Sequence, residues 1–138
     1  METPKQSVAE LVRGMFRAYE IKDRNMAESL VSAGFRFSSP YDDRISRKEY
    51  FERCWPNSER ITGFDIQSLL AGEAEAFVLY NVKLASGMKF RNAEHFRIEN
   101  GKIVEIEVFF GDPPAGVSKE SWRSKVTALQ PANSPGSN

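Results

Sequence analysis

The chain has 138 residues, and its 19 lysine and arginine residues balance its 19 aspartate and glutamate residues. This length suits a single domain with a hydrophobic core, and a net charge of zero gives no field that would attract nucleic acid or an anionic membrane surface. No apolar run approaches the roughly 18–20 residues of a membrane span, residues 1–6 lack a signal-peptide pattern, and the single cysteine permits no internal disulfide. The composition therefore predicts a cytoplasmic protein that binds neither nucleic acid nor a membrane.

The first helix is predicted from a cap and an apolar stripe. Ser7 and Glu10 have the spacing of a capping box. Apolar residues then recur at helical spacing as far as about residue 21. They are Val8, Leu11, Val12, Met15, Phe16 and Tyr19.

A second helix and a first strand are expected next. The pattern predicts a short helix over 26–31 that Gly34 ends, followed by a strand over 35–38. Pro40 is expected to close this strand into a polar loop over 41–44.

Ser46 and Glu49 form a second capping box, which opens another short helix that Pro56 is expected to end. This helix carries Tyr50, Phe51, Cys54 and Trp55.

Beyond this helix, alternating apolar residues predict four strands, over 61–71, 76–85, 88–98 and 102–110. Short turns join these strands, and the strongest turn signal is Asn100-Gly101. Sequential strands with short turns predict an antiparallel meander.

Helices followed by a long meander indicate the α+β class, with a strongly curved, cone-shaped antiparallel sheet wrapped around the N-terminal helices. The domain is expected to span residues 1–111. Residues 112–138 are predicted to be a C-terminal extension: a linker over 112–116, one weak helix over 118–129, and disorder from about residue 130.

The strand over 88–98 places two polar side chains on its apolar face. Alternation puts Asn92 and Glu94 on that face. Its apolar members are Phe90, Phe96 and Ile98. Because a buried carboxylate without a partner is costly, Glu94 is predicted to form the polar floor of a pocket as a general acid or base, with Asn92 orienting it or a ligand carbonyl. The alternative is that Glu94 pairs with a surface cation such as Arg36 or Arg91.

Three segments in this part of the chain carry a family resemblance: 94–97 (Glu-His-Phe-Arg), 100–104 (Asn-Gly-Lys-Ile-Val) and 109–111 (Phe-Phe-Gly). With the order of the elements, they resemble the SnoaL-like polyketide cyclase and ketosteroid isomerase branch of the nuclear transport factor 2-like superfamily, over about residues 7–111. The resemblance implies a conical pocket for a small apolar or aromatic ring compound, chemistry without a cofactor, and homodimers formed through the outer face of the sheet.

When the residues of the family's isomerase site are matched to positions of this chain, only part of the site is present. Ser39 stands where the family has its carboxylate base, just before a proline at the end of the first strand. Met15 stands where the family has a tyrosine oxyanion donor. Glu94 matches the aspartic acid that the family keeps protonated, with one extra methylene. The resemblance therefore implies an isomerase, cyclase or hydrolase other than a ketosteroid isomerase with the usual base.

The candidate walls of the pocket are mostly apolar and aromatic side chains. They are Met15, Phe16, Tyr19, Phe37, Ser39, Trp55, Tyr80, Phe90, Phe96, Val108 and Phe110. Each aromatic residue is also consistent with plain core, and the tyrosines are the better candidates because a buried hydroxyl seeks a partner. Asp42 and Asp43 either rim the pocket or serve as turn residues.

Charged side chains are expected on the outer face of the sheet. His95, the only histidine, alternates away from Glu94. On the last strand, Glu105 and Glu107 are expected to lie opposite the apolar residues Val104, Ile106, Val108 and Phe110. The charges suit either a polar dimer interface or a solvated face. Cys54 is interpreted as a small apolar residue.

One histidine and one cysteine cannot form a familiar zinc site within the chain, and no phosphate-binding glycine motif occurs. No metal or cofactor is therefore expected. Three functions remain open: an enzyme that moves a proton with Glu94, a non-catalytic ligand-binding module, and an assembly module whose pocket is filled by its own aromatic residues.

Overall fold

The computed structural model of the chain describes residues 7–111. The predicted linker, weak helix and disordered segment of the C-terminal extension lie outside the described residues. None of the helices within residues 7–111 is both long and apolar enough to cross a membrane.

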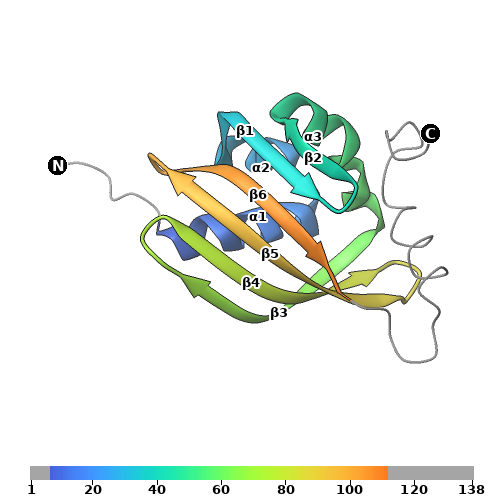
Figure 1. The fold of residues 1–138 in the computed structure, drawn as a ribbon. Coiled ribbons are helices and arrows are strands. Elements are labelled where there is room, and N and C mark those ends of the chain that lie inside the picture. Colours follow the sequence, from blue (N-terminus) through green and yellow to red (C-terminus); the bar gives the residue numbers. More distant parts are fainter. Residues whose placement is uncertain (1–6, 112–138) are drawn as a thin grey trace.

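The described part of the chain is an α+β fold with a single six-stranded sheet, as the sequence predicts (Figure 1). Its elements are α1 (Val8–Ile21), α2 (Arg24–Leu30), β1 (Val31–Ser39), β2 (Asp42–Ser46), α3 (Arg47–Arg53), the 3-10 helix η1 (Trp55–Arg60), β3 (Ile61–Ala71), β4 (Glu75–Leu84), β5 (Lys89–Glu99) and β6 (Lys102–Phe110). The strand order is β2-β1-β6-β5-β4-β3. The sheet curves over α1, which packs against β3 and β4, while α3 packs against β1 and β2.

Both predicted capping boxes are confirmed. The hydroxyl of Ser7 accepts from the backbone N–H of Glu10, whose carboxylate accepts in return from the N–H of Ser7, and Ser46 and Glu49 do the same at the start of α3. Helix α1 ends at Ile21, and the C-cap residue Lys22 adopts the left-handed conformation.

The predicted meander over β3 to β6 is also confirmed, with each strand antiparallel to the next. Asn100 and Gly101 both have positive φ, 51° and 74°, which the tight turn between β5 and β6 requires. At the end of β6, the N–H of Gly111 donates to the carbonyl of Arg91, and a Cβ at position 111 would overlap that carbonyl.

Three local predictions are wrong. Residues 42–44 of the predicted polar loop belong to the strand β2, and Gly34 lies inside β1 rather than ending a helix. Helix α3 ends at Arg53, before Pro56, which instead occupies the first turn of η1. Proline suits that position because its missing N–H would have no partner there.

The sheet also contains one parallel pair that the sequence pattern does not predict. Strand β1 runs parallel to β6, with Phe37 opposite Ile106 and Ser38 opposite Glu107. A parallel pairing between the first and last thirds of the chain leaves no turn signal in the sequence.

The core lies between the concave face of the sheet and the helices. On β5 the predicted alternation is confirmed, because the side chains at 90, 92, 94, 96 and 98 are all buried. On β6 the prediction fails at one end. The pairing register shifts between Arg97 and Ile98, and as a result Ile103 is fully buried while Val104 is only partly buried.

Candidate active site

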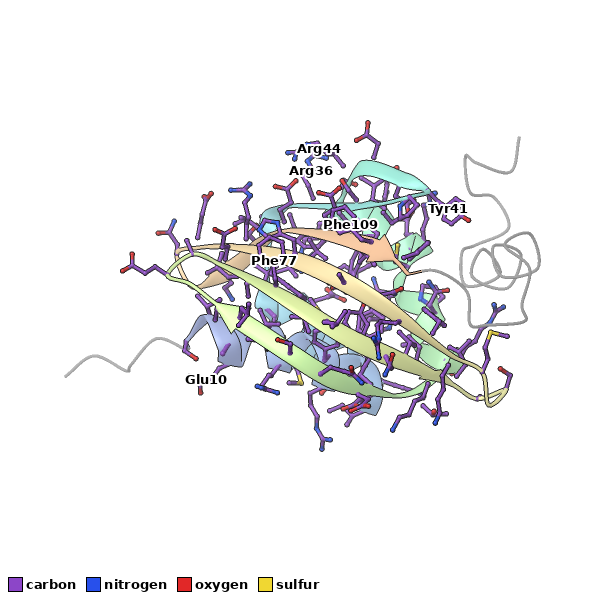
Figure 2. All side chains as sticks on the ribbon, turned by 60° about the horizontal axis from the view of Figure 1, so that its bottom comes forward. Glu10, Arg36, Tyr41, Arg44, Phe77 and Phe109 are labelled. Atoms are coloured by element: carbon purple, nitrogen blue, oxygen red, sulfur yellow. The ribbon has the colours of Figure 1, made fainter. Side chains whose placement is uncertain are left out.

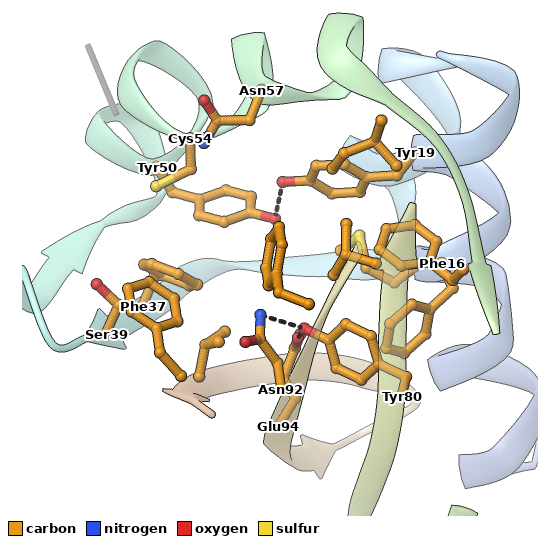
Figure 3. A pocket seen from close by; sticks show the side chains of 17 residues that line it. Phe16, Tyr19, Phe37, Ser39, Tyr50, Cys54, Asn57, Tyr80, Asn92 and Glu94 are labelled. Carbon is orange, nitrogen blue, oxygen red and sulfur yellow. Dashed lines mark hydrogen bonds between the residues drawn. The ribbon is translucent and has the colours of Figure 1, made fainter. Parts of the chain in front are cut away.

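A cavity of about 110 Å³ lies between the concave face of the sheet, α1, and the region where α3 meets η1 (Figure 3). It is lined by Met15, Phe16, Tyr19, Phe37, Ser39, Tyr50, Cys54, Asn57, Ile61, Phe64, Tyr80, Val82, Phe90, Asn92, Glu94, Val108 and Phe110. Most of these side chains are apolar, and a few hydroxyl, amide and carboxyl groups converge among them. This combination is typical of a small-molecule site.

The structure brings most of the sequence-predicted wall residues to this cavity, together with Asn92 and Glu94. Two predicted wall residues, Trp55 and Phe96, do not line it. Trp55 is one layer further out, with its ring centroid 4.7 Å from that of Tyr19. Phe96 is completely buried in the core, 6.0 Å from Phe16. Each packs behind a residue that does reach the cavity.

Six lining residues were not among the predicted site residues. They are Tyr50, Cys54, Asn57, Ile61, Phe64 and Val82. Val82 follows Tyr80 at strand spacing, and Tyr50 and Cys54 are four apart on the helix expected from the sequence, so periodicity could have found these three. Asn57 could not be found in this way, because the expected end of the helix at Pro56 hid the turn of η1 that carries it.

Glu94 is the central polar residue of the cavity. It points from β5 into the cavity, it is 9% exposed, and its Oε1 accepts a hydrogen bond of 2.5 Å from the hydroxyl of Tyr80. Burial raises the pKa of Glu94 to about 7, although the Tyr80 hydrogen bond acts in the opposite direction. Among the described residues no cation pairs with Glu94, and Arg91 bonds instead to Asn81 and Gln67.

Asn92 continues this polar network along the same strand. Its Nδ2 is 3.5 Å from the Tyr80 hydroxyl oxygen, to which it donates. Its Oδ1 is buried and has no hydrogen-bond partner within residues 7–111. Because the Tyr80 hydroxyl donates to Glu94, its oxygen is left as an acceptor, and this fixes which end of the Asn92 amide faces it.

A second polar group enters the cavity from the side of the helices. The hydroxyls of Tyr19 on α1 and Tyr50 on α3 are 2.5 Å apart, across the cavity from Asn92 and Glu94 (Figure 3). Burial raises the pKa of both tyrosines well above the usual range. Both hydroxyls therefore remain protonated at neutral pH and can act as donors.

Ser39 lines the cavity, but its hydroxyl is already engaged. It donates to Oδ2 of Asp42 at 2.8 Å and accepts from the N–H of Tyr41 at 3.1 Å. Asp42 is buried in β2 behind the wall, and its Oδ1 is 2.7 Å from Nη2 of Arg53. Asp42 is therefore neither a rim residue nor an exposed turn residue, whereas Asp43 is exposed.

The remaining titratable candidates have other surroundings. His95 lies on the outer face, where its Nε2 is 2.7 Å from Glu75 and its ring stacks on Phe77. Cys54 is buried in the cavity wall, and burial raises the pKa of its thiol. Within residues 7–111, no three histidine, cysteine, aspartate or glutamate side chains are placed to hold a metal ion.

Comparisons with known proteins identify relatives of this fold. A family model described as a SnoaL-like domain matches residues 12–106. A search of curated proteins finds no match. Among solved structures, an NTF2-like protein of unknown function from Cytophaga hutchinsonii is similar with a TM-score of 0.67 at 17% identity, covering 83% of this chain and 97% of that chain.

Two further solved structures carry functional names. A proposed ketosteroid isomerase from Kribbella flavida has a TM-score of 0.62 at 19% identity, covering 77% of this chain and 81% of that chain. IdmH, a proposed polyketide cyclase from Streptomyces antibioticus, has a TM-score of 0.61 at 13% identity, covering 72% of this chain and 88% of that chain. At these identities the similarity establishes the fold alone.

Proposed function

The chain belongs to the SnoaL-like domain family, and from this premise we propose that it is an isomerase, cyclase or hydrolase that moves a proton on a small, largely apolar ring compound. Glu94 is the general acid or base of this reaction. The observation that carries the proposal is the position of Glu94, buried in the wall of an apolar cavity and bonded to the hydroxyl of Tyr80.

The pKa of about 7 suits this role. At neutral pH both forms of the carboxyl group are populated, so it can take up a proton and return it within one catalytic cycle. A carboxyl group with an ordinary pKa would hold almost no proton to return at this pH.

The chemistry follows from the groups that surround a bound carbonyl compound. The Glu94 carboxylate takes a proton from the carbon next to the carbonyl, and the electron pair of that C–H bond moves to the carbonyl oxygen to give an enolate. Tyr19 and Tyr50 are the donors that stabilise this oxygen. Return of the proton to a different atom of the substrate completes an isomerisation.

The cavity volume limits the substrate. An apolar cavity of roughly 150 Å³ accommodates benzene, so a cavity of about 110 Å³ encloses at most a single ring, and the rest of the substrate extends toward the partly exposed lining residues. Those residues are Tyr19, Ser39, Asn57, Phe64 and Phe110.

The test is hydrogen–deuterium exchange at the carbon next to the carbonyl of acetophenone and cyclohexanone, followed by NMR in D2O. We expect the wild-type protein to accelerate the exchange, and Glu94→Gln to reduce the acceleration at least about a hundredfold. Glu73→Gln, which changes an exposed carboxylate between β3 and β4, is the matched control and should exchange like the wild type. Binding without accelerated exchange in the wild type would instead support the non-catalytic ligand-binding module.

We also propose that a second copy of the chain covers the outer face of the sheet. Phe77, Leu79 and Phe109 are 53%, 38% and 50% exposed, and Figure 2 shows Phe77 and Phe109 on the face turned away from α1. Exposed aromatic side chains grouped in this way are typical of an interface. Arg91 and Glu107 supply charges of both signs beside them, so this face can be complementary to its own copy across a two-fold axis.

A further inference from the structure

The polar groups of the cavity have hydrogen-bonding capacity that the described residues do not use, and this capacity indicates what a ligand must carry. On the sheet side, Tyr80 donates to Glu94 and accepts from Nδ2 of Asn92. The Oδ1 of Asn92 is therefore left as a buried acceptor without a partner within residues 7–111. Asn92 is only 5% exposed, so bulk water does not readily satisfy this oxygen.

On the helix side the unused group is a donor. The hydroxyls of Tyr19 and Tyr50 together carry two protons, and their hydrogen bond to each other uses one of them. No other hydrogen bond is formed by either hydroxyl within residues 7–111, so one O–H remains free to donate. Both side chains line the cavity.

We propose that the cavity selects ring compounds that carry a hydrogen-bond donor on one side and an acceptor on the other, of which hydroxyaryl ketones are the simplest class. The hydroxyl of such a ligand donates to Oδ1 of Asn92, and its carbonyl accepts from the Tyr19–Tyr50 pair. This inference rests on the proposed function, because it takes the cavity around Glu94 as the ligand site. To that function it adds the chemical class of the ligand and identifies Asn92 as the residue that binds the ligand's hydroxyl group.

Binding of matched probes to the full chain tests the proposal, with dissociation constants measured by calorimetry. The probes are 4-hydroxyacetophenone and 3-hydroxyacetophenone, which cover two spans between the groups. In 4-methylacetophenone a methyl group of similar size replaces the hydroxyl, and in 4-ethylphenol a methylene replaces the carbonyl. We expect the better hydroxyacetophenone to bind at least about tenfold more tightly than either compound with one group missing.

Variants assign the two contacts. Asn92→Leu should bind 4-hydroxyacetophenone and 4-methylacetophenone about equally. Tyr19→Phe and Tyr50→Phe should each keep the preference for the carbonyl, because the remaining hydroxyl then has a free proton. The double variant should lose the preference. Tyr41→Phe, which changes a tyrosine outside the cavity lining, is the matched control and should retain both preferences.

The proposal is overturned if the methyl compound binds the wild-type protein as tightly as the hydroxyl compounds, a comparison that needs no variant to fold. It is also overturned if Asn92→Leu keeps the hydroxyl preference. The exchange assay separates this failure from failure of the proposed function. If acetophenone exchanges in a way that depends on Glu94 but ligands with a hydroxyl group bind no better, the proposed function is supported and the ligand class is wrong. If ligands with a hydroxyl group bind better but no exchange is accelerated, the cavity is a selective binding site without the proposed activity.

Discussion

Burial of Glu94 links the site to the stability of the whole protein through proton binding. Its pKa rises from 4.5 to about 7 because burial disfavours the charged form. The native state therefore holds this proton more tightly than the unfolded chain does. The resulting contribution to stability, about 3 kcal/mol, is fully present below pH 4.5 and is lost as the pH rises through 7.

The first prediction follows from this direction of the pH dependence. Glu94→Gln removes the titrating group, so the free energy of unfolding of the variant relative to the wild type should rise by about 3 kcal/mol between pH 4 and pH 8. Urea denaturation at several pH values measures this difference. Glu73→Gln, the exposed control, should show no such trend. If the free energies of unfolding of Glu94→Gln and the wild type changed equally with pH, the raised pKa of Glu94 in the folded protein would be contradicted.

The second prediction concerns Asn92, whose buried oxygen lacks a partner within residues 7–111. Asn92→Leu replaces it by an apolar group of similar size, and the ligand-free protein should keep its stability or gain about 1 kcal/mol. Asn81→Leu is the control on the neighbouring strand, where the side-chain oxygen accepts from Arg91. This change should not stabilise the protein. A loss of stability in Asn92→Leu and not in Asn81→Leu would assign Asn92 a structural role.

At the scale of single residues, the sequence pattern identifies the two most important polar groups. Asn92 and Glu94 are predicted from alternation alone, because both interrupt an apolar face. The hydrogen bonds that they make are not predictable in this way. Tyr80 approaches them from a neighbouring strand, and the Tyr19–Tyr50 pair joins helices whose packing depends on the whole core.

At the scale of elements, α3 matters because it carries Tyr50 to the cavity. Its capping box joins Ser46 and Glu49, and without it the first turn has unsatisfied N–H groups. Ser46→Ala should therefore reduce the free energy of unfolding by about 1 kcal/mol, measured by chemical denaturation. Ser68→Ala, an exposed position on β3, is the control and should change stability little. An equal effect of both changes would show that the cap contributes nothing specific.

Local signals explain which elements the sequence predicts well. Capping boxes and the Asn100-Gly101 turn act between neighbours in the chain, so α1, α3 and the turn from β5 to β6 are all predicted. The parallel pairing of β1 with β6 and the existence of β2 depend on contacts between distant segments. The shift of register that buries Ile103 likewise arises only when β5 and β6 pair.

At the scale of the molecule, the proposed dimer forms through the outer face of the sheet. Phe109→Arg places a charge in the exposed apolar group formed with Phe77 and Leu79, and the dimer should become a monomer. Light scattering after size-exclusion chromatography measures the mass. Ile21→Arg, at an exposed apolar position on α1, should leave the dimer intact. A wild-type protein that is monomeric at all concentrations would refute the interface.

The sequence pattern indicates the location of this face but not its chemistry. Alternation correctly places His95 there, and the Glu105 carboxylate pairs with Arg97 as the charges suggest. The exposed aromatic side chains Phe77 and Phe109 were not singled out, because an aromatic residue in an alternating strand does not itself reveal which face it occupies.

The position of β6 has a consequence for how the protein forms during synthesis. It is the last of the described strands along the chain, yet it lies between β1 and β5 in the sheet. Until residues 102–110 have left the ribosome, β1 and β2 cannot join the three strands of the second half. Helix α1 can pack on β3 and β4 before then, but the two parts of the sheet are joined only by this one strand. The cavity, which combines Ser39 from one half with Glu94 from the other, can be completed only after translation has passed it.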